Sequence, residues 1–217
     1  MEEMEKIAYS IFSDVHGESE DSHPDVLLQM LRQREHVPRW VIGGDLYNVE
    51  RGIAAKSLEL MNYLRSHKEK IRRVRGNHDP EDDGFGIPTI QEYRFEVNRI
   101  KFCVKHGDEF DYWLHFISHP FVDAAIDTFC AVVKKTPSLN GLLPFFQKHL
   151  AKSLKRRAKQ FATQDKVGID VIICGHVHIP ECVPGYVNTG GKKNLAILDV
   201  YKSGHMAFHV LNPQIHN

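Results

Sequence analysis

The sequence predicts an α/β fold with a sheet of parallel strands, and two observations support this class. Three strands alternate with two helices along the first third of the chain, a succession typical of parallel sheets with helices on their faces. The chain has 217 residues, of which 42% are hydrophobic and 26% charged, so it can bury a core. We therefore expect a single domain, residues 1–217, with a modest insertion.

The elements of the first third are assigned from hydrophobic spacing. Short apolar runs that end in glycine and polar residues are typical of buried strands that lead into a loop. Segments with apolar residues three and four positions apart are typical of helices. On these criteria strands are expected at 7–12, 40–42 and 71–74, and helices at 24–34 and 54–64.

The rest of the chain has a different pattern. Residues 92–97 and 100–105 alternate around Asn98-Arg99, which predicts a hairpin. Residues 110–166 are mostly helical in pattern, and we interpret them as a helical insertion or cap rather than a separate domain. Further strands are expected at 170–174, 183–188, 195–201 and 205–211.

Composition excludes several classes of protein. The formal net charge is zero and the pI is near 7.2, so no basic field indicates specific nucleic-acid binding. The first six residues lack the apolar core of a signal peptide, and no uncharged run reaches the roughly 20 residues that span a bilayer. We therefore expect a cytoplasmic protein with four reduced cysteines. Cys174 and Cys182 flank a histidine pair, which leaves a zinc site there as the alternative to small buried residues.

Each polar cluster of the sequence stands where an apolar run ends. In open α/β sheets, ligands bind beyond the carboxyl ends of the strands, so the loops that follow these runs can converge. Glycine lets the backbone turn sharply there and brings short side chains close together. The clusters are Asp14-Val15-His16, Gly44-Asp45, Gly76-Asn77-His78-Asp79, His106-Gly107-Asp108 and Gly175-His176-Val177-His178.

The residue types in these clusters indicate divalent metal ions. Carboxylate and imidazole groups together suit manganese, iron or zinc, whereas an all-oxygen set suits magnesium or calcium. Seven candidate ligands are too many for one tetrahedral zinc, but they suffice for two ions that share a carboxylate and clamp a phosphoryl group. The alternative, that these are ordinary turn and capping residues, would have to hold for five blocks independently. The candidates are Asp14, His16, Asp45, Asn77, His106, His176 and His178.

Taken in order, the five clusters resemble the motifs of the calcineurin-like metallophosphoesterases. All five blocks occur in the family's order and together span roughly three quarters of the chain. Within the family, the run from His106 to Asp111 followed by a helical stretch is similar to the UDP-2,3-diacylglucosamine pyrophosphatase-like subgroup. Residues 172–178 and 187–190 also fit that subgroup.

The resemblance implies a four-layer αββα sandwich of two mixed sheets, with the helical cap inserted. It also implies a dinuclear phosphoesterase that hydrolyses a phosphomonoester, phosphodiester or pyrophosphate bond by attack of a metal-bridging hydroxide. Manganese is the expected metal, with iron, zinc, magnesium or nickel as alternatives. One ion would be held by Asp14, His16, Asp45 and His178, and the other by Asp45, Asn77, His106 and His176.

The same resemblance implies roles for residues beside the ligands. His78 would steady or protonate the leaving oxygen, oriented by Asp79. Asn48 or Asp108 would hydrogen-bond the ligand side chains. Lys192 and Lys193 are candidates to hold substrate phosphates, because cationic side chains near the site suit that role.

Three positions depart from the pattern of the relatives. Asn48 stands where many relatives carry an acidic residue, and His78 stands where the diacylglucosamine pyrophosphatases commonly carry arginine. Gly191-Lys192-Lys193 replaces an Asp-Trp pair that often follows in the subgroup. We therefore expect a phosphate-ester substrate of unassigned class, with a lipid-linked substrate like UDP-2,3-diacylglucosamine as the alternative.

The insertion combines an apolar stripe with a basic run. Such stripes are typical of core-packing helices, and the alternative is a cap over a lipid or nucleotide-linked substrate. His115 and His119, four residues apart, would share a helix face, where partial burial is favoured over a third metal ion. The basic run predicts a solvated face, a contact with substrate phosphates or a peripheral contact with an anionic membrane. It also allows a second hypothesis, a non-catalytic metal-binding scaffold that acts on a partner through this cap. The run is Lys148, Lys152, Lys155, Arg156, Arg157 and Lys159.

Overall fold

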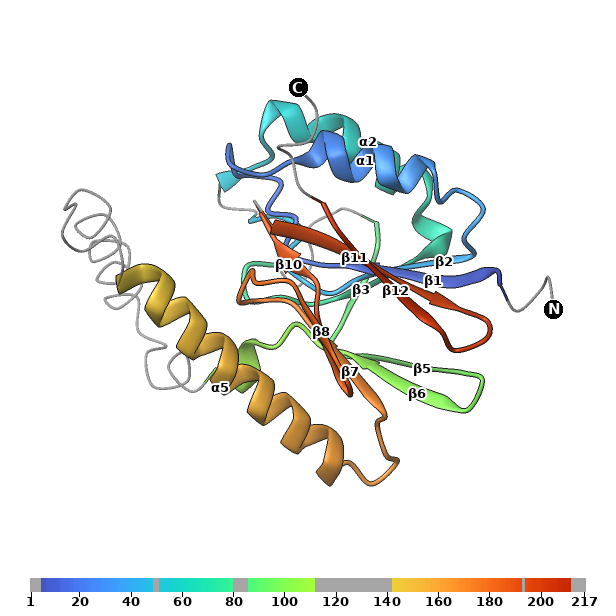
Figure 1. Ribbon diagram of the computed structural model, residues 1–217. Coiled ribbons are helices and arrows are strands. Elements are labelled where there is room, and N and C mark those ends of the chain that lie inside the picture. The colour runs from blue at the N-terminus through green and yellow to red at the C-terminus, as the bar shows by residue number, and fades with distance from the viewer. Residues whose placement is uncertain (1–4, 49–50, 80–85, 112–141, 193, 212–217) are drawn as a thin grey trace.

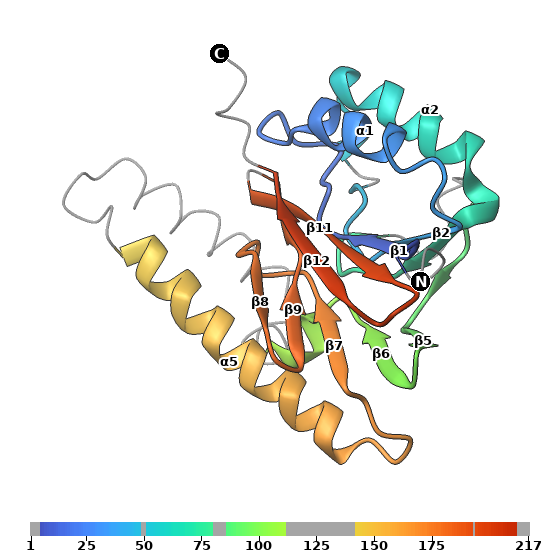
Figure 2. The same ribbon diagram turned by 45° about the vertical axis from the view of Figure 1, so that its right-hand side comes forward.

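A computed structural model describes residues 5–48, 51–79, 86–111, 142–192 and 194–211 (Figure 1). Two mixed sheets pack together, and helices cover the outer face of each (Figures 1 and 2). The predicted αββα arrangement of two mixed sheets is confirmed. Within the ranges given above, no helix is long and apolar enough to cross a membrane.

The larger sheet has seven strands in the order β10-β11-β1-β2-β3-β4, and β12 pairs with β11 as well. Strands β1 to β4 are parallel, whereas β11 is antiparallel to β1, β10 and β12. The parallel part therefore sends the loops after β1, β2 and β3 to one edge of the sheet. The strands are β1 Ile7–Phe12, β2 Arg39–Ile42, β3 Ile71–Val74, β4 Thr89–Ile90, β10 Gly190–Gly191, β11 Asn194–Tyr201 and β12 Met206–Val210.

The smaller sheet has five strands in the order β5-β6-β7-β9-β8, with β6, β7 and β9 parallel. The predicted hairpin joins β5 to β6 through Asn98 and Arg99, whose φ angles are 47° and 66°. Two consecutive left-handed residues suit a two-residue hairpin turn. The strands are β5 Tyr93–Val97, β6 Ile100–Val104, β7 Val171–Cys174, β8 Glu181–Val183 and β9 Tyr186–Asn188.

The structure corrects several predicted elements. The strand expected at 183–188 is the hairpin of β8 and β9, because Gly185 turns the chain with a φ of 75°. The two-residue strands β4 and β10 were not predicted, since two residues carry no periodicity. The predicted helix at 24–34 is α1 (Pro24–Arg32), and the one at 54–64 is a 3₁₀ turn, η2 (Ala55–Ser57), followed by α2 (Leu58–Ser66). Short 3₁₀ turns also lie at η3 (Lys68–Lys70) and η4 (Asp108–Phe110).

Three apolar layers hold the sheets and helices together. Successive strand residues point to opposite faces, so Phe12 packs under α1 and α2 while Ile11 packs between the sheets. The third layer lies under α5 (Leu142–Gln164), where Leu154, Ala158 and Ala162 meet the outer face of the smaller sheet. These three residues are four positions apart, which places them on one face of the helix.

The predicted insertion at 110–166 falls partly outside the described residues, which omit 112–141. Its last part is α5, which packs on β7 and β9 as an outer-layer helix. The packing residues 154–162 follow the apolar stripe, whose own side chains lie outside the described residues, so the expectation that the stripe serves the core stays a prediction. His115 and His119 lie outside the described residues, as does most of the stripe that precedes α5.

Candidate metal centre

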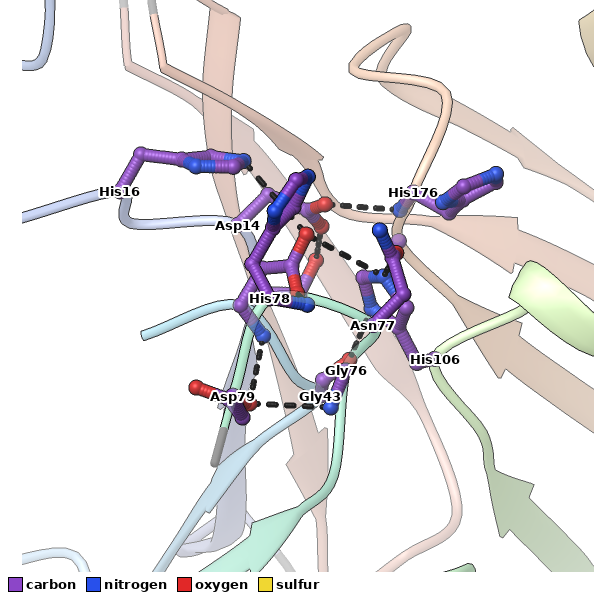
Figure 3. A network of polar contacts seen from close by, with 12 residues as sticks. Asp14, His16, Gly43, Gly76, Asn77, His78, Asp79, His106 and His176 are labelled. Carbon is purple, nitrogen blue, oxygen red and sulfur yellow. Dashed lines mark hydrogen bonds and ion pairs between the residues drawn. The ribbon is translucent and has the colours of Figure 1, made fainter. Parts of the chain in front are cut away.

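Loops from both sheets meet at one point (Figure 3). The larger sheet contributes the loops after β1, β2 and β3, and the smaller sheet those after β6 and β7. Strands β1, β2 and β3 are parallel to one another, as are β6 and β7, so within each sheet the carboxyl ends of these strands point to the same edge, where the polar residues lie. The predicted convergence of the polar clusters is therefore what the topology produces.

Two overlapping groups of ligand atoms form at this point. The first is Asp14, His16 and His178, and the second is Asp14, Asp45 and His106; in each, the ligand atoms lie within 4.8 Å of one another. Asp14 is common to both groups. Asp45 also faces both, because its Oδ2 lies 3.6 Å from His16 Nε2 and 3.4 Å from His106 Nε2.

These side chains fit divalent cations by their chemistry and by their burial. Asp14, His16, Asp45 and His106 are all at most 2% exposed. Buried carboxylates are costly unless they are paired or coordinate a metal. The Nε2 atoms of His16 and His178 lie 3.1 Å apart, so two imidazoles direct ring nitrogens at the same small space. This donor set of carboxylate and imidazole groups suits manganese, iron or zinc.

The remaining predicted ligands lie beside these groups. Asn77 Oδ1 is 3.0 Å from His106 Nε2. The backbone N–H of His176 donates to Asp14 Oδ1 at 2.8 Å, and the His176 ring centre is 5.2 Å from that of His106. His176 Nε2 faces Asp111 Oδ2 at 3.2 Å, so among the described residues His176 belongs to neither group.

Backbone strain is concentrated in these loops. Five of the predicted ligands have positive φ angles of 49–69°, which L-residues adopt at a cost. Strain of this kind persists where the surrounding structure enforces it, and it is frequent at functional sites. The five are Asp14, His16, Asp45, His176 and His178.

Two glycines make room for the buried carboxylates. A Cβ atom at Gly76 would overlap the carboxylate of Asp45, and one at Gly175 would overlap that of Asp14. Any side chain at either position would displace a ligand. Glycine is therefore required here for close approach, as the sequence pattern suggested.

The electrostatics of the cluster couple acids to imidazoles. Burial alone would raise the pKa of Asp45, but the charge of nearby His106 outweighs it and holds the pKa well below its usual range. Burial alone would lower the pKa of His106, yet Asp45 raises it well above the ordinary value. His78 is exposed as a residue, but partial desolvation of its imidazole lowers its pKa despite the opposing charge of Asp45. The buried acids are thus held as anions, which is the form that binds cations.

His78 and Asp79 take different positions. The side chain of His78 is exposed, and its ring centre lies 5.6 Å from that of His16. Asp79 Oδ2 accepts the backbone N–H groups of Asp45 at 2.8 Å and Gly76 at 2.9 Å (Figure 3). Its Oδ1 accepts the Leu46 N–H at 3.0 Å.

Asp79 also pairs with Arg73 Nη2 at 2.7 Å, and both side chains are fully buried. The bonds of its carboxylate thus go to Arg73 and to the backbone of the ligand loops. The expected role of orienting the His78 ring is not what these contacts describe. They make Asp79 a brace between the Asp45 loop and the Gly76 loop.

The other predicted neighbours are placed as follows. The backbone N–H of Asn48 donates to Glu18 Oε2 at 3.1 Å. Asp108 begins η4 and lines a cleft together with Asn77. The backbone N–H of Lys192 donates to Asp14 O at 3.0 Å, so Lys192 lies beside the cluster. Lys193 lies outside the described residues.

Three polar contacts of the candidate ligands were not predicted from the sequence. Glu18 Oε1 lies 3.0 Å from His16 Nδ1, Asp111 contacts His176, and Ser13 bonds to the carboxylate of Asp14. Ser13 and Glu18 stand within two positions of a ligand, and Asp111 ends the run that begins at His106. Closeness in sequence was the available signal, but it does not say which neighbour turns inward.

A buried cluster of aspartate and histidine at the strand ends of an αββα sandwich defines a metal-dependent phosphoesterase. The family model described as calcineurin-like phosphoesterase matches residues 10–180. The chain therefore belongs to the calcineurin-like phosphoesterase family. No curated protein matches the chain in sequence.

Solved structures share this fold at low sequence identity. YfcE, a phosphoesterase from E. coli, is 16% identical, with 94% of this chain and 99% of that chain covered and a TM-score of 0.50. An archaeal phosphodiesterase is 16% identical, with 94% and 99% covered and a TM-score of 0.45. Wild-type Vps29 from Entamoeba histolytica, complexed with Zn²⁺, is 15% identical, with 94% and 97% covered and a TM-score of 0.44. At these identities the likeness concerns the fold alone.

Replacing Asp79 by Asn should destabilise the protein strongly. An amide offers one acceptor oxygen to the donors that the carboxylate now serves, and it removes the negative charge with which the buried guanidinium of Arg73 pairs at Nη2. Breaking a buried pair in this way typically costs about 3–5 kcal/mol. We expect the free energy of unfolding, measured by urea denaturation, to fall by that amount. Asp108→Asn is the control and should unfold like the parent, and parental stability in Asp79→Asn would contradict the brace.

Proposed function

We propose that the chain is a dinuclear phosphoesterase whose two ions share Asp45. The observation that carries this proposal is the pair of overlapping ligand groups, with Asp45 Oδ2 between a histidine of each. A single tetrahedral site would need only four of these side chains. The overlap supports two adjacent ions and a phosphate ester as the substrate.

The residues present would hold the two ions in the sets that the family resemblance implies. When bound, such ions stabilise charge on a transferring phosphoryl group and lower the pKa of water. Manganese is the proposed metal, with iron, zinc, magnesium or nickel as alternatives. One set is Asp14, His16, Asp45 and His178, and the other is Asp45, Asn77, His106 and His176.

His78 is the chain's proposed contact with the leaving group. It is exposed, whereas the neighbouring ligands His16 and Asp45 are buried, so it stands at the open side of the cluster. Its backbone N–H donates to Asp45 Oδ1 at 3.0 Å, which fixes its position relative to the ligands. An imidazole there can donate a proton or a hydrogen bond to a departing oxygen. Asp79 acts only indirectly, by holding the loop.

Purified protein should hydrolyse nitrophenyl phosphate esters only with added divalent metal. Asp45→Ala should abolish the activity, because it removes the carboxylate that faces both ligand groups. The measurement is nitrophenol release from mono- and bis-ester substrates after chelation and after readdition of Mn²⁺, Mg²⁺, Zn²⁺ or Fe²⁺. Glu20→Ala, at an exposed acidic position, is the control. Full activity in Asp45→Ala would contradict the proposed phosphoesterase site.

His78→Ala should lower kcat while leaving metal uptake intact. General acid–base groups typically contribute about 10²- to 10⁴-fold, so we expect a decrease in that range. The measurements are steady-state kinetics and metal content per chain. The loss should be smaller for substrates with good leaving groups, which need less protonation. Equal losses for nitrophenyl and alkyl phosphate esters would argue against this role.

The class of phosphate ester follows from comparing mono-, di- and pyrophosphate substrates. Preferential cleavage of a UDP-linked pyrophosphate would favour the alternative of a hydrolase like the UDP-2,3-diacylglucosamine pyrophosphatases. The scaffold alternative requires that the parent protein turn over no phosphoester with any of these metals. The exposed His78 favours the enzyme, since a scaffold needs no leaving-group acid.

We also propose a peripheral contact between α5 and an anionic membrane surface. The 23-residue helix carries six basic residues and no acidic one, although the whole chain is neutral. Leu154 and Ala158 face the core, while Lys148, Lys152 and Arg156 are exposed. Charge complementarity with anionic lipid headgroups is the argument for this partner.

Sedimentation with phosphatidylserine vesicles should carry the protein down at low salt, and added salt should release it. Each basic residue near such a surface contributes about 1 kcal/mol, so replacing Lys148, Lys152 and Arg156 by Gln should weaken binding about 10²-fold. The matched control replaces three exposed basic residues elsewhere, Arg32, Arg39 and Lys68. Protein that stays in the supernatant at low salt would count against this contact.

A further inference from the structure

Glu18 is a buried acid beside the metal centre that belongs to neither ligand group. It lies in the loop after β1, two residues beyond His16, and its side chain is 6% exposed. The next acid in the sequence, Glu20, is exposed. A carboxylate taken out of water needs hydrogen-bond partners, so the contacts of Glu18 indicate what it does.

Both carboxylate oxygens of Glu18 are engaged, and they reach two different loops. Oε1 lies 3.0 Å from His16 Nδ1, and Oε2 accepts the backbone N–H of Asn48 at 3.1 Å. The same two loops are joined by backbone bonds from His16 N to Asp45 O at 3.1 Å and from Gly17 N to Leu46 O at 2.9 Å. Glu18 therefore adds a side-chain link between the first and second ligand loops.

The contact with His16 determines which ring nitrogen carries the proton. An ionised carboxylate can only accept hydrogen bonds, so Nδ1 of His16 must be the donor. In the neutral imidazole the lone pair is then on Nε2. Nε2 is the atom that faces His178 at 3.1 Å and Asp45 at 3.6 Å. The protonated nitrogen points away from the ligand groups, and the lone pair points into them.

The partners of two other histidines, His106 and His176, do not allow the same test. His106 Nδ1 lies 3.1 Å from the carbonyl oxygen of Gly43, and a backbone carbonyl cannot be exchanged by mutation. Asp111 contacts His176, which belongs to neither group. Among the described residues, Glu18 is thus the side chain whose replacement would test the orientation of a histidine within a ligand group. Asn48, where many relatives carry an acid, contacts this same carboxylate through its backbone.

We infer that Glu18 is a positioning residue that holds His16 in the tautomer and orientation needed to present Nε2 to a metal ion. It accepts the Nδ1–H bond and fixes the Asn48 segment against the first ligand loop. Partners of this kind typically contribute 10- to 100-fold to metal affinity. The inference rests on the proposed function, because it assumes that His16 is a ligand.

Glu18→Gln tests the inference with little change in side-chain size. The amide has one acceptor oxygen, but two N–H donors face it, so it cannot serve both His16 and Asn48. We expect the affinity for Mn²⁺ alone, measured by isothermal titration calorimetry, to fall 10- to 100-fold. Glu18→Ala removes both acceptor oxygens, and its affinity for Mn²⁺ should fall at least as far. Glu20→Gln makes the same charge change in the same loop and should keep the parental affinity.

A spectroscopic readout separates this role from a merely structural one. In metal-free parent protein, ¹⁵N-resolved NMR of the His16 ring should report the Nδ1–H tautomer of the neutral imidazole. In the two Glu18 variants the Nε2–H form should appear, a change that a loss of stability alone would not produce. Parental Mn²⁺ affinity in both Glu18 variants, or an unchanged tautomer in both, would overturn the inference.

The outcome for the parent distinguishes the two proposals. A parent protein that binds neither Mn²⁺ nor Zn²⁺ would remove the proposed function and this inference with it. A parent that binds metal and hydrolyses phosphate esters, together with Glu18 variants that bind equally well, would remove the inference alone.

Discussion

The candidate metal centre depends on a single buried carboxylate that belongs to neither ligand group. The Asp79 carboxylate accepts hydrogen bonds from the backbone N–H groups of Asp45, Leu46 and Gly76, and the fully buried Arg73 side chain balances its charge. The loop after β1 is joined to this assembly by backbone bonds, including one from Asp14 N to Gly44 O at 2.9 Å. Hydrogen bonds to the backbone therefore fix the relative positions of the loops after β1, β2 and β3, independently of the candidate ligand side chains.

The layered fold supplies the stability that these strained loops require. A residue held at an unfavourable φ costs of the order of 1–3 kcal/mol, and several ligands are held in this way. The apolar layers on both sides of the larger sheet offset this cost, since Ile11 and Phe12 at the end of β1 are fully buried immediately before Ser13 and Asp14. The buried end of β1 thus leads directly into the strained candidate ligand Asp14.

The sequence was informative where a signal is local and repeated. Strands such as β1 and β3 were predicted to the residue from their apolar runs, and the polar blocks that follow such runs contain the residues of the two candidate ligand groups. Two-residue strands and the turn at Gly185 carry too few residues for periodicity to detect. The hydrogen bonds by which Asp79 joins two loops were not predicted, because a sequence does not show where backbone N–H groups point. Glu18 was missed for a related reason, since its burial depends on a loop thirty residues away.

The two sheets contribute unequally to each ligand group, yet both contribute to both. His178 and His106 come from the smaller sheet, whereas Asp14 and its other companions come from the larger one. An ion in either group would therefore link loops of one sheet to loops of the other. Binding to the folded state alone adds about 1.4 kcal/mol of stability for each tenfold rise in free metal above the dissociation constant. The concentration of free metal would thus set the stability of the packing between the two sheets, as well as the activity of the centre.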